Sequence, residues 1–151
     1  MRRMTPRMLQ LVLFVALAMG ATACSTKGGA EKFVGSWIYA GAINPNCNNI
    51  AAVDLTGDAV TITAPDSSHL RVDLAGYCMI NFDVDGFSAN AQGGQSCTFD
   101  IPMLGPQAIS ITKWTLTMTG DDVITSDFNG SILICFPTGS GTLTRQSDAG
   151  A

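Results

Sequence analysis

Turn-forming residues recur at intervals of about ten residues along most of the chain, and this spacing constrains the fold more than any other feature. The turn signals are Gly57-Asp58, Pro65-Asp66-Ser67, Ala75-Gly76, Asp85-Gly86, Gly93-Gly94, Leu104-Gly105-Pro106, Gly120-Asp121-Asp122, Asn129-Gly130 and Gly139-Ser140-Gly141. Segments separated by turns at this interval are typical of an all-β sandwich or barrel. Asp-Gly and Asn-Gly pairs tolerate the positive φ of two-residue type I′ turns, so we expect antiparallel hairpins at Asp85-Gly86 and Asn129-Gly130.

Between the turns, apolar and polar residues alternate. The apolar positions of this pattern are Val60, Ile62, Leu70, Val72, Leu74, Ile80, Phe82 and Val84. A period of two gives each strand one buried and one solvated face, and no segment after Ala30 carries a helical stripe of apolar residues. We therefore expect one all-β domain over residues 31–146, built either as an antiparallel β-barrel of about eight or more short strands or as a β-sandwich.

The segment from Ile109 to Met118 changes phase. Ile109 and Ile111 share one face, whereas Trp114, Leu116 and Met118 fall on the other. A β-bulge at Thr112-Lys113 would bring both sets into the core of one long strand. Two separate strands would explain the pattern as well.

The first 23 residues have the three-part organisation of a secretory signal peptide. Arg2, Arg3 and Arg7 precede an apolar run from Leu9 to Met19, which is too short to span a bilayer. We therefore expect residues 1–23 to be a signal peptide that directs export.

The segment Ala21-Thr22-Ala23-Cys24-Ser25 resembles the lipobox of bacterial lipoproteins, in which a cysteine is acylated on sulfur and becomes the first mature residue. The resemblance implies lipid attachment at Cys24 and a membrane partner. Ser25 implies the outer membrane, because Asp at this position of the family favours inner-membrane retention. The same residues also form an Ala-x-Ala site for the ordinary signal peptidase, which would cut the same bond and leave Cys24 without lipid.

The chain has five cysteines, an odd number, and exported proteins usually pair their thiols. Setting Cys24 aside leaves four, which allow three pairings. Counting outward from a turn at Asp85-Gly86 places Cys78 near the next turn, close to Cys97 on the following strand. We therefore expect two disulfides, Cys78 with Cys97 and Cys47 with Cys135.

Charge excludes several classes of partner. After residue 23 the chain has five basic residues against twelve acidic ones, a formal net charge of −7, and the basic residues are scattered. Nucleic-acid binding requires clustered Lys and Arg, so we expect no nucleic-acid partner. Residues 24–30 are expected to form a lipidated flexible tether, and residues 147–151 a disordered tail.

The sequence contains no convincing catalytic or metal-binding set. His69 is the only histidine, so zinc sites with two or three histidines cannot form. Asp66, Ser68 and His69 are neighbours in one turn segment, and such neighbours rarely reach the geometry of a catalytic triad. We expect no enzymatic activity, no cofactor and no metal.

The segment Phe33-Val34-Gly35-Ser36-Trp37-Ile38-Tyr39 resembles the first strand of lipocalins and related calycin barrels, whose Gly-x-Trp places an indole across the closed end of the barrel. In that family an Arg on or after the last strand packs on the Trp, which implies a barrel-closing pair of Trp37 and Arg145. The resemblance also implies an apolar interior able to hold a small hydrophobic ligand.

The alternative is that side chains fill the interior. The aromatic candidates for this are Phe82, Phe87, Phe99, Trp114 and Phe128. The function expected from the sequence is a lipid-anchored, non-enzymatic cell-envelope protein that binds a small apolar molecule. The competing function is a structural or protein-interaction module at the cell surface, which an exposed apolar patch on a solid core would favour.

Overall fold

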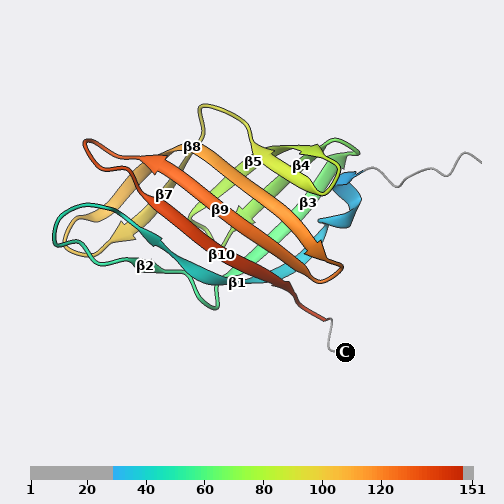
Figure 1. The fold of residues 1–151 in the computed structure, drawn as a ribbon, viewed down its shortest axis with the longest axis horizontal. Helices are drawn as coiled ribbons and strands as arrows, with labels where there is room; N and C mark the ends of the chain where they lie inside the picture. The colour runs from blue at the N-terminus through green and yellow to red at the C-terminus, as the bar shows by residue number, and fades with distance from the viewer. Residues whose placement is uncertain (1–28, 148–151) are drawn as a thin grey trace, which may run out of the picture.

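The computed structural model describes residues 29–147, which form a short 3₁₀ helix followed by ten β-strands (Figure 1). The elements are η1 (Gly29–Lys32), β1 (Gly35–Asn44), β2 (Val53–Asp54), β3 (Ala59–Asp66), β4 (His69–Leu74), β5 (Cys78–Asp85), β6 (Ser88–Ala91), β7 (Ser96–Ile101), β8 (Gly105–Gly120), β9 (Val123–Ser131) and β10 (Thr138–Arg145). Within this range no helix has the length and apolar character needed to cross a membrane.

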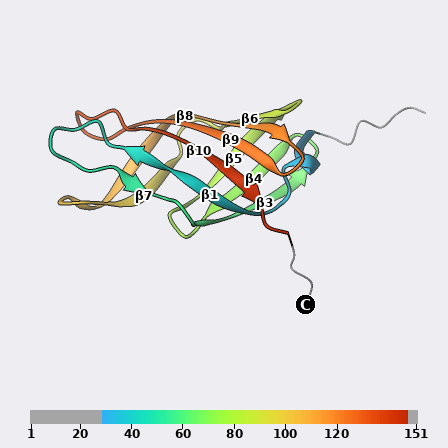
Figure 2. The same ribbon diagram turned by 60° about the horizontal axis from the view of Figure 1, so that its bottom comes forward.

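Eight of the strands close into an antiparallel barrel. The hydrogen-bonded order runs β10-β9-β8-β6-β5-β4-β3-β1, and β10 pairs with β1 to complete the ring. The two other strands extend one end of the barrel, because β2 pairs with the second half of β1 and β7 with the first half of β8 (Figures 1 and 2). The prediction of an all-β barrel is confirmed, and the sandwich alternative is wrong.

Aromatic and branched aliphatic side chains pack the interior. Trp37, Phe82 and Phe99 have no exposed surface. The predicted inward positions of the alternating strands are buried, except Val84, which is partly buried. Trp114 packs edge-on against Phe82 and Phe128, with ring centroids 5.5 and 5.6 Å apart. Such edge-to-face pairs add to the stabilisation that burial provides. Aromatic side chains from the nearby strands β5, β8 and β9 therefore pack against one another in the interior.

The change of phase in β8 comes from a bulge. β8 is one continuous strand of 16 residues, and its pairing with β9 shifts register between Ile111 and Lys113. The extra residue lets Ile111 and Trp114 both point inward, and both are buried. The bulge prediction is confirmed, and the alternative of two strands is wrong.

The hairpin between β5 and β6 turns one residue later than expected. Asp85 pairs with Ser88, so the two turn residues are Gly86 and Phe87. Only Gly86 has positive φ, at 60°, a pattern that fits a type II′ turn with glycine first and not the expected type I′ turn. Phe87, a candidate for the interior, instead stands at the tip with 61% of its surface exposed.

Two other expected turns are wrong, because their glycines lie inside strands. Asn129 and Gly130 belong to β9, and Gly139-Ser140-Gly141 belongs to β10. A Cβ on Gly130 would lie 2.5 Å from Cγ2 of Ile109, and one on Gly141 would lie 2.7 Å from the Tyr39 ring. These glycines are needed for close packing in the core and not for a turn.

Both expected disulfides are present. Cys78 joins Cys97 with a Cα–Cα distance of 4.8 Å, and Cys47 joins Cys135 with a Cα–Cα distance of 5.6 Å. The pairing is as predicted, although the turn from which it was counted lies one residue further along the chain. Two disulfides indicate an oxidising, exported environment.

The folded domain begins earlier than expected. Gly29 and Ala30, assigned to the tether from the sequence, form part of η1, and Ala30 has no exposed surface. The predictions of a signal peptide at 1–23 and of lipid at Cys24 lie outside the described residues, as does most of the expected tail.

Candidate functional site

Trp37 and Arg145 meet at the end of the barrel where η1 lies. They are directly paired across β1 and β10, and the guanidinium carbon of Arg145 stands 4.2 Å from the centroid of the Trp37 ring. The indole N–H of Trp37 donates to the carbonyl oxygen of Phe33 at 2.9 Å. A guanidinium over an indole contributes about 1 to 2 kcal/mol when partly desolvated.

Arg145 also ties together three segments of the chain at this end. Its Nη1 donates to the carbonyl oxygen of Val34 at 2.7 Å, and its Nη2 to those of Lys32 and Asp121 at 3.0 and 3.3 Å. Its Nε donates to a carboxylate oxygen of Asp122 at 3.1 Å. Four of the five N–H donors of the guanidinium therefore hold η1 and the β8–β9 hairpin against β10.

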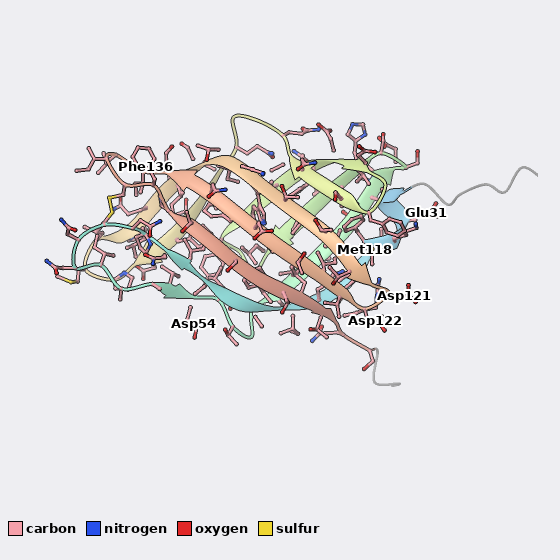
Figure 3. All side chains as sticks on the ribbon, in the orientation of Figure 1. Glu31, Asp54, Met118, Asp121, Asp122 and Phe136 are labelled. Atoms are coloured by element: carbon pink, nitrogen blue, oxygen red, sulfur yellow. A yellow bond between two sulfur atoms is a disulfide. The ribbon has the colours of Figure 1, made fainter. Side chains whose placement is uncertain are left out.

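An open hollow of about 830 Å³ lies next to this arginine, on the outside of the barrel. Figure 3 shows several of its residues gathered at the same end, opposite Phe136. Val34, Phe87 and Met118 supply apolar surface, and charged side chains of both signs surround them. The hollow therefore combines an apolar floor with a charged rim.

The opposite end of the barrel carries exposed apolar side chains on two loops. They are Met103 (88% exposed), Leu104 (47%), Leu133 (92%), Ile134 (89%) and Phe136 (68%). We call this set the apolar loop end. Met103 and Leu133 also have positive φ, at 70° and 49°, a conformation that costs non-glycine residues energy and is concentrated at functional sites.

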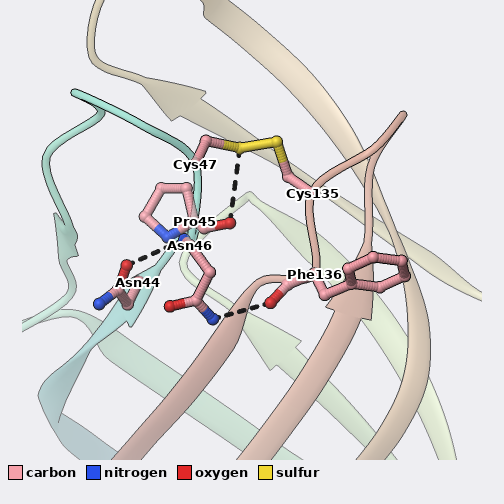
Figure 4. Close-up of a disulfide and its surroundings, with 6 residues drawn as sticks. All are labelled: Asn44, Pro45, Asn46, Cys47, Cys135 and Phe136. Atoms are coloured by element: carbon pink, nitrogen blue, oxygen red, sulfur yellow. Dashed lines mark hydrogen bonds between the residues drawn. A yellow bond between two sulfur atoms is a disulfide. The ribbon is translucent and has the colours of Figure 1, made fainter.

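The Cys47–Cys135 disulfide anchors the apolar loop end (Figure 4). It ties the β1–β2 loop to the β9–β10 loop, directly before Phe136. Asn46 adds two bonds, since its side-chain amide donates to the carbonyl oxygen of Phe136 at 2.8 Å and to the hydroxyl of Thr138 at 3.0 Å. The loops are thus cross-linked in one arrangement, which lowers the entropy cost of binding.

The interior holds one buried polar centre. Ser126, 1% exposed, accepts hydrogen bonds from Nε1 of Trp114 at 2.9 Å and from the hydroxyl of Tyr39 at 3.4 Å. Burial raises the pKa of Tyr39 above its ordinary value, while the hydrogen bond to Ser126 partly offsets this rise. The centre satisfies two buried donors and fixes the orientation of both rings.

The His69 segment does not form a catalytic triad. Asp66 and Ser68 both approach the same ring nitrogen of His69, Nδ1, at 2.8 and 3.1 Å, whereas a triad needs the acid and the nucleophile on opposite nitrogens. Hydrogen bonds from the backbone N–H of Ser68, from His69 and from the Ser68 hydroxyl lower the pKa of Asp66 to about 2. The set is a solvated turn network.

Comparisons with known proteins identify no family. No protein-family model and no curated protein match the chain. Among solved structures, a redesigned β-barrel is similar at 14% identity and a TM-score of 0.49, covering 81% of this chain and 98% of that one. A structure of EF1p2_mFAP2b bound to DFHBI has 14% identity and a TM-score of 0.46, with 80% and 98% covered.

Sequence reasoning missed both surface features. The apolar loop end has a readable signal, because Ile132-Leu133-Ile134-Cys135-Phe136 breaks the alternation of apolar and polar residues without a turn glycine. The hollow has none, since it is assembled from η1, the β5–β6 turn, the β8–β9 hairpin and β10. Over residues 29–147 no group of three or more potential metal ligands comes together.

Proposed function

We propose that this protein is an exported, lipid-anchored envelope protein that acts as an interaction module and has no catalytic role. The packed barrel is a rigid support, and the apolar loop end docks onto an apolar surface of another envelope protein. The observation that carries the proposal is the set of five exposed large apolar side chains at one end of the barrel, three of them, Leu133, Ile134 and Phe136, on a disulfide-linked loop. Exposed apolar clusters on soluble domains mark sites of interaction.

The pairing of cysteines supports the anchor. Cys47, Cys78, Cys97 and Cys135 all lie in disulfides, which leaves Cys24 as the one cysteine without a partner in either bond. Cys24 stands in the segment that resembles the lipobox, at the position where bacterial lipoproteins carry their lipid. Several acyl chains there would hold the domain stably at a membrane, with the outer membrane as the proposed location.

The packed interior favours docking over transport of a small hydrophobic ligand. The rings of Phe82, Trp114 and Phe128 pack against one another in the interior and occupy space that a carrier would leave for its ligand. Trp37 closes one end beneath Arg145. Lipids extracted from the purified native protein would test the ligand hypothesis directly by mass spectrometry.

The position of the loops favours a protein partner over the membrane of the anchor. Five residues from Cys24 to Gly29 reach at most about 18 Å, so a lipid at Cys24 would hold the η1 end close to the bilayer. β8 runs from the apolar loops to the hollow, and its 16 residues span about 50 Å. An upright barrel would therefore present the apolar loop end far from its own membrane.

The charge pattern points the same way. Residues 45–52, 102–104 and 132–137, which form the three loops at this end, include no charged residue. Loops that insert into membranes are usually supported by nearby Lys and Arg, which attract anionic lipids. An uncharged loop set on an acidic domain fits an apolar protein surface instead.

A photo-crosslinking amino acid at Leu133, in the full-length protein expressed in its native host, tests the docking. We expect one adduct of defined mass, identified by mass spectrometry and lost in the Ile134→Asp variant. Met79, 53% exposed on the barrel wall, provides the matched control, and Met79→Asp should leave the adduct unchanged. Thermal unfolding of both variants should show that the barrel remains folded, since exposed substitutions change stability little.

Three outcomes would contradict the docking proposal. The Leu133 adduct could be a second copy of this chain, it could consist only of lipid, or it could survive Ile134→Asp. The anchor is tested separately by the intact mass of the mature protein, where a Cys24 without acyl groups would reject it.

A further inference from the structure

The hollow at the η1 end is built from segments that are far apart in sequence. Val34 follows η1, Phe87 stands at the β5–β6 turn, and Met118 lies near the end of β8. Val34 and Phe87 are 39% and 61% exposed, and Met118 is partly exposed. Their side chains give a hollow of about 830 Å³ an apolar floor that an organic group of moderate size can cover.

The rim of the hollow is suited to positive charge. Glu31, Asp121 and Asp122 contribute three carboxylates, against Lys32 and Arg145. Asp122 is ion-paired with Arg145 at 3.1 Å, so Glu31 and Asp121 are the carboxylates available to a ligand. Arg145 already donates four hydrogen bonds to protein oxygens, so it has little capacity left for an anionic ligand. Lys32 is then the one basic group lining the hollow that remains available.

The position of Lys32 shows what the floor attracts. Its ammonium nitrogen lies 3.9 Å from the centroid of the Phe87 ring, directly over the ring face. Both side chains are exposed, so burial does not force this contact. The negative face of an aromatic ring attracts cations, and the ammonium group of Lys32 occupies the place that a ligand's ammonium group would take.

We propose that this hollow binds organic cations, specifically molecules that carry a primary or quaternary ammonium group beside an apolar body. The ammonium group lies over Phe87, near the carboxylates of the rim, and the apolar body covers Met118 and Val34. Lys32 competes for the same ring face and acts as an internal occupant. The site is at the opposite end of the barrel from the apolar loops and does not depend on docking there.

This arrangement predicts that substitutions at Lys32 and Phe87 change the affinity for a cation in opposite directions. Lys32→Met removes the internal cation and one positive charge, so binding of a cation should become about two- to fivefold tighter. Phe87→Leu keeps an apolar side chain but removes the aromatic face, so binding should weaken by about the same factor. Asp121→Asn should also weaken binding, and this loss should shrink at high salt.

The test is an NMR titration of the mature protein with benzyltrimethylammonium as the probe and benzenesulfonate as the anionic control. We expect saturable shifts of the backbone amide signals of Phe87 and Met118 with the cation and none with the sulfonate. Ser140→Ala, an exposed change on β10 away from the hollow, should bind like wild type.

The proposal is overturned if the cation gives no saturable shift at millimolar concentration, if the sulfonate binds equally well, or if Lys32→Met weakens binding. Each variant should first give a wild-type pattern of amide signals outside the hollow, which confirms the fold. Loss of the Leu133 adduct would reject the docking function without affecting this titration, so the two failures are distinguishable.

Discussion

Replacing Ser126 with alanine should destabilise the barrel far more than the loss of one oxygen atom suggests. The hydroxyl accepts from Trp114 at 2.9 Å and from Tyr39 at 3.4 Å, and all three residues are at least 96% buried. Leaving the indole N–H without an acceptor costs about 1 to 3 kcal/mol, and losing the longer bond adds about 0.5 kcal/mol. We expect a total of about 1.5 to 3.5 kcal/mol, or roughly a 10- to 400-fold change in the unfolding equilibrium.

Urea unfolding with both disulfides intact measures this cost. Trp37 and Trp114 are buried, so their fluorescence reports the loss of the core. With a slope near 1.5 kcal/mol per molar urea, the midpoint of Ser126→Ala should fall by roughly 1 to 2.3 M. Ser140→Ala removes an exposed hydroxyl and should change the free energy of unfolding by less than about 0.5 kcal/mol.

A double-mutant cycle separates the hydrogen bond from general packing. In a Trp114→Phe background the indole donor is already gone, so Ser126→Ala should cost about 1 kcal/mol or less. The reasoning is refuted if Ser126→Ala costs under 0.5 kcal/mol in the wild type, or if its cost is the same in both backgrounds.

Three further predictions concern the same barrel. Gly141→Ala should cost about 1 to 3 kcal/mol in urea unfolding, because its Cβ would lie 2.7 Å from the Tyr39 ring. Replacing both Cys47 and Cys135 by alanine should cost about 4 to 5 kcal/mol, given their separation of 88 residues, against about 3 kcal/mol for the disulfide that spans 19. Burial raises the pKa of Tyr39 above its ordinary value of 10.0, so the hydroxyl loses its proton at lower pH in the unfolded chain than in the folded one. The contribution of Tyr39 to the free energy of unfolding is therefore fully present below pH 10 and is lost as the pH rises above it. Unfolding curves at pH 8 and pH 11 should show a smaller alkaline loss for Tyr39→Phe than for wild type.

The strand pattern could be predicted because it depends on local residues. Each alternating run needs one buried face, and the bulge in β8 follows from a phase change within ten residues. The glycines of β9 and β10 could not be assigned, because the reason for Gly130 is the Ile109 side chain on the neighbouring strand and the reason for Gly141 is the Tyr39 ring. A local turn rule treats every Asn-Gly pair alike, whereas packing against neighbouring strands determines whether a given pair forms a turn.

The disulfides show how a wrong register can still give the right pairing. Moving the turn from Asp85-Gly86 to Gly86-Phe87 changes which residues face each other, yet Cys78 and Cys97 remain near the same end of adjacent elements. The expected register did not, however, predict that Phe87 is exposed. A shift of the turn by one residue moves Phe87 from the interior to the tip of the hairpin, where it contributes to the floor of the hollow.

Closure of the barrel determines where such a protein can offer binding surfaces. Among the described strands only β2 and β7 are paired on one side alone, and β2 has two residues. The N–H of Thr98 in β7 already donates to the carbonyl oxygen of Tyr77. Little free edge is therefore left for a partner strand to add to the sheet.

The two proposed binding surfaces lie at the two ends of the barrel, and their chemistry differs. One end is uncharged and apolar and is cross-linked by a disulfide, whereas the other combines an aromatic ring with carboxylates beside the start of the folded domain. A partner drawn to one end gains nothing from the other, because hydrophobic contact and charge pairing select different surfaces. The closed barrel lies between the two kinds of binding, so each can be removed by mutation without disturbing the other.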